Sequence, residues 1–312
     1  MRFFLLVLLT TSFLGCSSEP ATINQLQFIG SHNSYKLAMD DKFMAALTKQ
    51  NPGAARSLDY SHIPIVDQLD LGIRKLELDV FFDQLNKSLV VGHVQQIDMN
   101  SSCSPLSVCF DHILAWSEAN KSHVPIWVSF NTKDQVIEGL PDPDSFSNEA
   151  LELLDQEIEQ AFEGKLIWPK DVRGLSWPKI EDARGKFLFI LDEGGKKQEH
   201  YLRNWKSRPM FVPVAAADPS AAILIINDPV TNHEKIADLV RRGFMVRTRA
   251  DAGTIEARKQ LTNRKELAIM SGAQAVSTDY YLPSKHFESN YRVEAFIRCN
   301  PINTGRHCRF AE

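Results

Sequence analysis

The sequence predicts a single closed (β/α)8 barrel, an α/β fold of the TIM type. The chain of 312 residues lies above the usual size of one domain but within the range of closed α/β barrels. Short β-rich runs alternate with amphipathic helical stretches, and no repeat, low-complexity tract or second core interrupts the pattern. Because alternation of strand and helix implies right-handed crossovers, about eight such strands form a closed parallel barrel.

The expected strands share short length, β-branched or aromatic content and flanking turn residues. They cover residues 26–29, 73–81, 88–93, 125–131, 186–192, 223–227, 244–250 and 274–280. Helical periodicity is clearest at 148–162, 233–242 and 254–270, and we expect irregular loops at 35–64 and 141–147.

The N-terminal segment has the layout of a secretory signal. Arg2 is followed by an apolar run over residues 3–9, too short to span a membrane as a mature helix, and by small residues up to Cys16. The sequence LGCS at 14–17 resembles the bacterial lipoprotein signal, in which the cysteine is acylated and becomes the new N-terminus. We therefore expect residues 1–15 to be a signal peptide and residues 16–312 to form one mature domain. An ordinary cleaved signal peptide with an incidental cysteine is the alternative.

Acylation of Cys16 would anchor the chain to a membrane outside the cytoplasm. Ser17 at the next position favours the outer over the inner membrane of a Gram-negative cell, where an Asp is the usual retention signal. The net charge of −4 gives no bulk attraction to nucleic acid. A monomer is the default expectation for an extracytoplasmic barrel of this kind.

The other four cysteines form two close pairs in a chain expected to reach an oxidising compartment. Disulfides Cys103–Cys109 and Cys299–Cys308 are the simplest of three possible pairings. Zinc is the rival interpretation, but no pair has the two-residue spacing of a zinc knuckle.

Polar side chains cluster where three of the expected strands end or cross the barrel rim. His32 and Asn33 follow the first strand, and His93 ends the third. The period of two along the second strand puts Lys75, Glu77 and Asp79 on one face and leaves the apolar face to pack on helices. Active sites of such barrels lie at these strand ends.

These groups suit phosphodiester chemistry. Two carboxylates on one strand face repel each other unless a cation lies between them, and Asn33, Glu77 and Asp79 offer oxygen ligands for Ca2+ or Mg2+. Of two histidines beside such a cation, one can remove a proton from an attacking hydroxyl and the other can protonate the leaving oxygen. Each residue alone could equally be structural.

Several motifs, in their order, resemble the bacterial Ca2+-dependent phosphoinositide-specific phospholipase C family. They are GSHNSY (30–35), QLDLGIR (68–74), LELD (76–79), the stretch 93–109, WS (116–117), VRTRAD (246–251), SGAQ (271–274) and STDY (277–280). The resemblance implies a barrel that cleaves phosphatidylinositol or a related inositol phospholipid to diacylglycerol and a cyclic inositol phosphate. By it, His32 and His93 match the catalytic histidines, and Asn33, Glu77 and Asp79 match calcium ligands. The four paired cysteines also match the family's pattern.

One departure concerns the metal. Asn131 stands where the family has a further calcium-binding glutamate. Its amide oxygen can still coordinate Ca2+, but the site loses a negative charge, so calcium affinity should fall. Weakened calcium dependence, a different metal and lost activity all stay open. Lys133, on the same strand face, could partly occupy the site electrostatically.

Four residues, Lys133 among them, are candidates for substrate contact. Arg247 and Arg249 share a strand face, and a guanidinium suits bidentate phosphate binding. Internal ion pairs with Asp251 or Asp279 are the alternative. Asp279 could orient a histidine or an inositol hydroxyl.

Two other functions stay open. A glycerophosphodiester phosphodiesterase shares the barrel and the Glu-x-Asp pattern, but that family favours His-Arg-Gly where this chain has His32-Asn33-Ser34. A noncatalytic lipoprotein that binds inositol lipids or glycans, with turnover lost through Asn131, is the alternative from another class.

Overall fold

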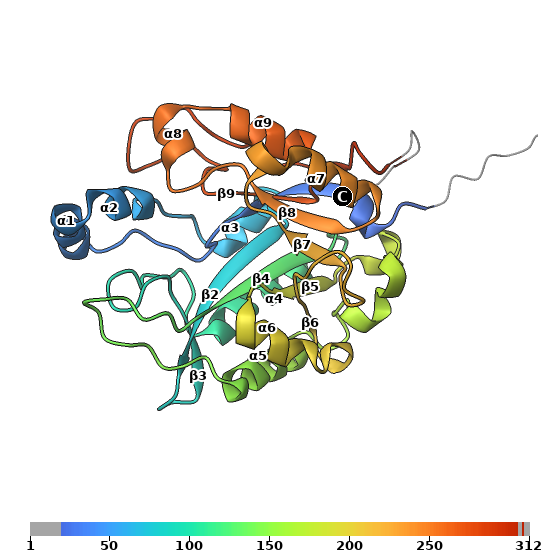
Figure 1. Ribbon diagram of the computed structural model, residues 1–312, viewed down its shortest axis with the longest axis horizontal. Helices are drawn as coiled ribbons and strands as arrows, with labels where there is room; N and C mark the ends of the chain where they lie inside the picture. Colours follow the sequence, from blue (N-terminus) through green and yellow to red (C-terminus); the bar gives the residue numbers. More distant parts are fainter. Residues whose placement is uncertain (1–19, 305–307, 309–312) are drawn as a thin grey trace, which may run out of the picture.

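A computed structural model describes residues 20–304 and 308 of the chain (Figure 1). Eight parallel strands form a nearly closed barrel in the order β6-β5-β4-β2-β1-β9-β8-β7. They are β1 (Leu26–Ser31), β2 (Lys75–Asp83), β4 (Ile126–Lys133), β5 (Phe187–Leu191), β6 (Met210–Phe211), β7 (Ile223–Ile225), β8 (Met245–Arg249) and β9 (Ala275–Thr278). The prediction of a (β/α)8-type barrel is confirmed.

Helices cover the outside of the barrel. They are α3 (Ile65–Asp70), α4 (Leu106–Ala119), α5 (Asn148–Ala161), α6 (Gly195–Leu202), α7 (Pro229–Arg241), α8 (Ile255–Lys259) and α9 (Asn263–Met270). Single 3-10 turns occur at Ile23–Gln25, Pro169–Asp171, Arg173–Leu175, Glu181–Ala183 and Trp205–Ser207. Two more helices, α1 (Asp41–Gln50) and α2 (Pro52–Leu58), project from the side of the barrel where β1 ends (Figure 1).

Local sequence explains where the covering helices begin. The Ser147 hydroxyl accepts a hydrogen bond from the Ala150 N–H at the start of α5, and Asp228 accepts one from the Val230 N–H at the start of α7. Both arrangements satisfy N–H groups that have no partner within the helix. The apolar stripe of α5, which includes Leu151 and Leu154, is fully buried against the barrel.

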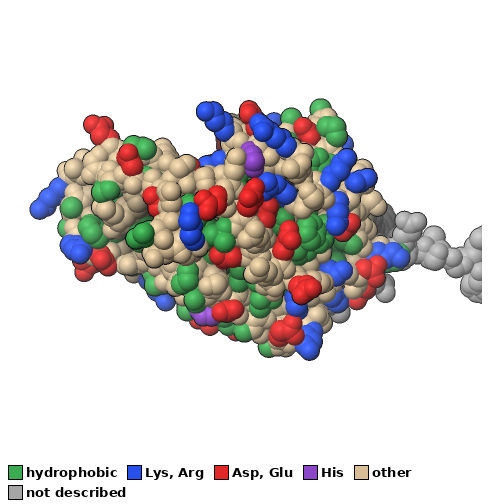
Figure 2. Space-filling view, turned by 90° about the horizontal axis from the view of Figure 1, so that it is seen from below, with side chains coloured by type: hydrophobic (Ala, Val, Ile, Leu, Met, Phe, Trp, Pro, Cys, Tyr) green, Lys and Arg blue, Asp and Glu red, His purple; other side chains and the backbone are tan. Residues whose placement is uncertain are grey.

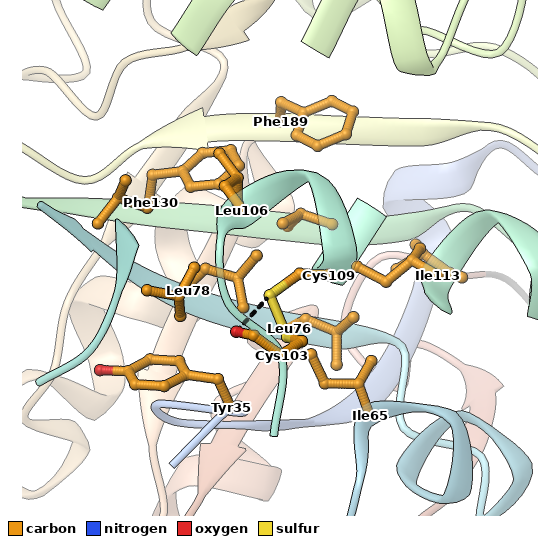
Figure 3. Close-up of a cluster of buried hydrophobic side chains, with 14 of the residues drawn as sticks. Tyr35, Ile65, Leu76, Leu78, Cys103, Leu106, Cys109, Ile113, Phe130 and Phe189 are labelled. Carbon is orange, nitrogen blue, oxygen red and sulfur yellow. Dashed lines mark hydrogen bonds between the residues drawn. A yellow bond between two sulfur atoms is a disulfide. The ribbon is translucent and has the colours of Figure 1, made fainter. Parts of the chain in front are cut away.

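Strand β2 separates the apolar core from the polar interior. Leu76 and Leu78 are fully buried on its outer face, beside Cys109 and Ile113 of α4 (Figure 3). Burying each leucine side chain stabilises the folded state by about 1.5–3 kcal/mol relative to leaving it exposed. Because successive side chains alternate in direction, this packing turns Glu77 and the other polar residues of β2 into the barrel.

The predicted third barrel strand was wrong in its role. Residues 88–91 form β3 (Ser88–Val91), which pairs antiparallel with β2 and projects with it as a hairpin. The strand missing from the predicted eight is β6, which lies between β5 and β7 along the chain and has only two residues, too few for the pattern to predict. A further strand, β10 (Ile297–Cys299), pairs antiparallel with the start of β1.

The helix predictions hold with two differences. Residues 254–270 divide into α8 and α9, and the stretch 35–64, expected as a loop, contains α1 and α2. None of the residues of α1 is buried. The helix therefore does not pack into the core.

Both predicted disulfides are present, Cys103–Cys109 and Cys299–Cys308. Cys16 and the signal segment lie outside the described residues, so the lipid anchor stays a prediction. Within residues 20–304, no helix is long and apolar enough to cross a bilayer. Acidic and basic side chains are interspersed on the face in Figure 2, as the small net charge implies.

Gly30 permits the close approach of β1 and β2, and we predict that Gly30→Ala destabilises the fold. A Cβ there would lie 2.5 Å from the Lys75 Cβ and 2.9 Å from its carbonyl oxygen, so backbone must move. We expect a loss of about 1–3 kcal/mol in the free energy of unfolding, measured by urea denaturation. Gly53→Ala is the control, because its Cβ would meet only Asn51 Oδ1 at 3.4 Å. Equal stability of the two variants would contradict the requirement for glycine at position 30.

Candidate active site

The turn after β1 holds His32 and Asn33 in place through contacts with β2. The Ser34 N–H donates to the Glu77 carbonyl (2.9 Å), and the Ser34 hydroxyl accepts from the Glu77 N–H (2.8 Å). Asn33 has a φ of 46°, a left-handed conformation that asparagine tolerates better than most residues. Its amide donates to the Tyr60 hydroxyl at 2.8 Å. The turn is therefore fixed directly beside Glu77.

The His32 ring lies between two carboxylates. Its Nδ1 is 2.8 Å from Asp279 Oδ1, and its Nε2 is 3.6 Å from Glu77 Oε1. An anionic Asp279 assigns the proton to Nδ1, which leaves Nε2 as an acceptor, 3.3 Å from a terminal nitrogen of the Arg249 guanidinium. With 17% of the side chain exposed, His32 can act on a bound molecule as a base.

Charges around His32 set its protonation. Burial and the adjacent Arg249 guanidinium lower the pKa of His32, against the opposing effect of Asp279. Burial would raise the pKa of Asp279, but His32 and Arg249 outweigh it and hold that pKa below its usual range. The pair at neutral pH is accordingly a neutral imidazole and an ionised carboxylate.

His62 braces the backbone of His32. Its Nε2 donates to the His32 carbonyl at 2.8 Å, and its Nδ1 lies 3.1 Å from the Tyr281 hydroxyl. Burial lowers the pKa of His62 to about 4. A neutral ring satisfies both contacts, with Nδ1 as acceptor for the tyrosine.

His93 is held in the same way as His32, on a different part of the chain. The β2–β3 hairpin extends out of the barrel and returns, so that the Gly92 N–H donates to the Asp79 carbonyl at 3.2 Å. This return places His93 beside β2. Its Nδ1 is 2.8 Å from Asp98 Oδ2, and Lys36 donates to the other Asp98 oxygen at 2.8 Å. The Nε2 of a ring that is 18% exposed is again left for a ligand.

Glu77 lies inside the barrel and carries two cationic partners. Lys75 Nζ contacts its Oε2, which also accepts from the Arg247 guanidinium at 2.7 Å. Burial alone would raise the pKa of Glu77, but Lys75 and Arg247 hold it well below its usual range. Glu77 is therefore a permanently ionised group at neutral pH.

Asp79, Asn131 and Lys133 form the outer part of the site. The β2–β4 register puts Asp79 directly opposite Asn131. Lys133 Nζ is 2.8 Å from Asp79 Oδ2, and the contact is an ion pair without regular hydrogen-bond geometry. Asp79 is 1% exposed, whereas the Lys133 side chain is 29% exposed.

The two arginines of β8 differ in accessibility. Arg247 is 2% exposed and contacts Glu77 and Asn227. Its internal partner is thus neither Asp251 nor Asp279. Arg249 lies against the His32 ring, with both terminal nitrogens 3.3 Å from ring nitrogens, and pairs with Asp279 at 3.4 Å.

Several residues that shape the site were not singled out from the sequence. Asp98 follows His93 by five positions in one turn, a local signal that could have found it. His62 and Tyr60 lie in the stretch taken as a loop. Asp192, after β5, shows no such signal; burial raises its pKa to about 6 against the effect of Arg247.

These residues fit a resident calcium ion poorly. Calcium in proteins takes six to eight oxygen ligands with several carboxylates among them. Here Glu77 and Asp79 already pair with cations, and the amide of Asn131 stands where the family has a third carboxylate. Among the described residues, no group of three His, Cys, Asp or Glu side chains is arranged to hold a metal ion.

We predict that acid destabilises the fold through His62. The pKa of His62 is about 4 in the folded chain and about 6.5 when unfolded, so its stabilising contribution is complete above pH 6.5 and is lost toward pH 4. His62→Gln keeps a donor for the His32 carbonyl but cannot titrate. Between pH 7 and pH 4, the wild type should lose about 3 kcal/mol of unfolding free energy more than the variant, as measured by urea denaturation. If the difference in unfolding free energy between the wild type and His62→Gln does not change with pH, His62 is not the cause of the acid destabilisation.

Comparison with solved structures supports the fold. A calcium-dependent phosphoinositol-specific phospholipase C from a Gram-negative Pseudomonas matches with a TM-score of 0.57 and 16% identity, over 89% of this chain and 95% of that chain. Its myo-inositol complex matches equally, with a TM-score of 0.57 and 16% identity over 90% and 96% of the two chains. A Ca2+-dependent phosphatidylinositol-specific phospholipase C from Streptomyces antibioticus has a TM-score of 0.58 and 19% identity, over 84% and 95%.

A search of curated proteins found no match. The family profile described as "Phosphoinositide phospholipase C, Ca2+-dependent" matches residues 21–87 and 83–301. These segments span most of the chain and contain both histidines, the polar face of β2 and the arginines of β8. The chain belongs to the Ca2+-dependent phosphoinositide phospholipase C family.

Proposed function

We propose that the protein is a phosphodiesterase that cleaves phosphatidylinositol-type lipids to diacylglycerol and cyclic inositol phosphate. The observation that carries the proposal is the pair of partly exposed histidines, each with Nδ1 on a buried aspartate. His32 pairs with Asp279, and His93 pairs with Asp98. Such pairing fixes the tautomer and leaves one ring nitrogen for proton transfer.

The reaction transfers one proton at each histidine. The neutral His32 Nε2 takes the proton of the inositol 2-hydroxyl, whose oxygen attacks phosphorus. The bond from phosphorus to the diacylglycerol oxygen breaks, and His93, in its protonated form, gives that oxygen a proton. Arg249 lies beside His32, where its guanidinium can contact phosphoryl oxygens.

The proposed setting is the membrane that holds the substrate. A lipid on Cys16 would keep the enzyme at an extracytoplasmic surface, as the leader sequence and the disulfides suggest. A second function, binding of inositol lipid without turnover, is favoured by one observation, the amide at Asn131 in place of a carboxylate. Retention of the His32→Ala variant on phosphatidylinositol vesicles, with no turnover by the wild type, would support it.

We predict that His32→Ala and His93→Ala each lower the release of cyclic inositol phosphate at least about a hundredfold, because each removes one proton-transfer group. The assay uses the full chain in mixed micelles of phosphatidylinositol and detergent, with and without calcium. His112→Ala, an exposed histidine on α4, is the matched control and should retain activity. A wild type that releases no inositol phosphate under any condition would refute the proposal.

The pH dependence tests the role of His32 separately. Because the pKa of His32 lies below 6.5, kcat/KM should fall on the acid side only below about pH 6.5. Arg249→Met removes a positive charge beside the ring, which raises the pKa of His32 and should move this acid limb to higher pH. An acid limb that stays in place in the variant would argue against His32 as the base.

A further inference from the structure

We infer that Lys133 supplies, as a tethered cation, the positive charge that calcium supplies in the family, so that this chain binds no resident metal ion. The inference rests on the proposed phosphodiesterase function and concerns the same site. It is carried by the ion pair of Lys133 with Asp79 and by the replacement of a carboxylate at Asn131.

The inner carboxylate of the expected calcium site is already neutralised. Glu77 Oε2 contacts both Lys75 and Arg247, neither of which can withdraw to solvent, because their side chains are at most 3% exposed. Lys75 also donates to the Ser31 carbonyl and to the Ser277 hydroxyl, at 3.2 Å each. A calcium ion on Glu77 would therefore lie near two fixed positive charges.

The outer carboxylate is paired as well, but with a partly exposed partner. Asp79 is buried, and without Lys133 its charge would lack a cation within the described part of the site. Asn131, opposite Asp79, adds an amide that carries no charge. Of the three positions where the family has a carboxylate, one thus holds a neutral amide and the other two hold carboxylates that already have cationic partners.

Lys133 is placed to act on a substrate. Its stem starts on β4 beside the site, and its ammonium lies between the buried Asp79 and solvent, with 29% of the side chain exposed. A lysine ammonium has three donors, so it can keep the contact with Asp79 and still donate to a phosphoryl oxygen. Such a donor stabilises the negative charge that develops on phosphorus oxygens in the transition state.

The first test needs no variant. Calcium is titrated into the full-length wild type in detergent by isothermal titration calorimetry, and lipid cleavage is compared in calcium and in EGTA. We expect no calcium binding up to millimolar concentration and cleavage rates that agree within about twofold. Micromolar calcium binding, or loss of cleavage in EGTA, would overturn the inference.

The second test removes the charge of Lys133. Lys133→Met, which keeps the length of the stem, should lower kcat/KM about a hundredfold in EGTA, whereas Lys133→Arg should keep most of the activity. Lys87→Met is the matched control, because Lys87 pairs with Glu149 on the exposed surface. A Lys133→Met variant that folds, as judged by its melting temperature, and keeps wild-type activity would contradict the inference.

The third test restores the family's charge pattern. The double variant Asn131→Glu with Lys133→Met should gain calcium binding in the calorimeter, which neither the wild type nor Lys133→Met shows. This readout is independent of turnover. If the wild type cleaves no lipid, the proposed function fails, but calorimetry still decides whether Lys133 excludes calcium. A double variant that remains unable to bind calcium would overturn the inference.

Discussion

The buried charge of Glu77 is the constraint on which the interior of the barrel depends. Its carboxylate is tied to Lys75 on its own strand and to Arg247 on β8. Lys75 in turn bonds to β1 and β9 through Ser31 and Ser277, so one ionic cluster links four strands across the barrel. Removing one partner of such a pair would leave an uncompensated buried charge, at a cost of about 3–5 kcal/mol. The same cluster fixes the part of Glu77 that faces His32.

The two aspartates behind His32, Asp251 and Asp279, differ in their readiness to ionise. Asp251 accepts from the Asp279 N–H at 2.9 Å and also contacts the Thr278 hydroxyl. Burial and the neighbouring Asp279 raise the pKa of Asp251 to about 7, whereas His32 and Arg249 keep Asp279 ionised. Two adjacent buried carboxylates do not both ionise readily, and Asp279, which contacts the His32 ring, is the one that stays ionised. Asp251 thus acts on the site through Asp279.

The sequence was sufficient for the features that follow from local periodicity. The alternation of side chains in β2 predicted that Glu77 and Asp79 face the interior. The location of active sites at the strand ends of such barrels predicted that His32 lies at the same rim. The error at β3 also has a local cause. Only four residues separate β2 from β3, whereas a parallel connection needs a dozen or more, so the spacing already indicated an antiparallel hairpin.

The partners of the site residues could not be predicted in the same way. The contact of His32 with Asp279 joins residues 247 positions apart, and that of Arg247 with Glu77 joins residues 170 apart. Several acids and bases could have formed such pairs, and only the closure of the barrel selects among them. For Arg247, the sequence suggested two aspartates, and the structure instead provides Glu77.

The pairing at the outer part of the site is the basis of the proposed role of Lys133, in which two positions on one strand change the cation of the site. Exchanging a carboxylate for Asn131 removes attraction for a divalent ion, and Lys133 on the same face of β4 balances the carboxylate that remains on β2. A calcium ion must be held by several ligands at once, whereas a lysine is held by its own backbone and needs only Asp79 to orient it. The cation then cannot be lost by dilution or chelation. In the proposed reaction, its single charge offers a phosphate less electrostatic stabilisation than a divalent ion does, so more of the stabilisation of the transition state is assigned to Arg249 and the two histidines.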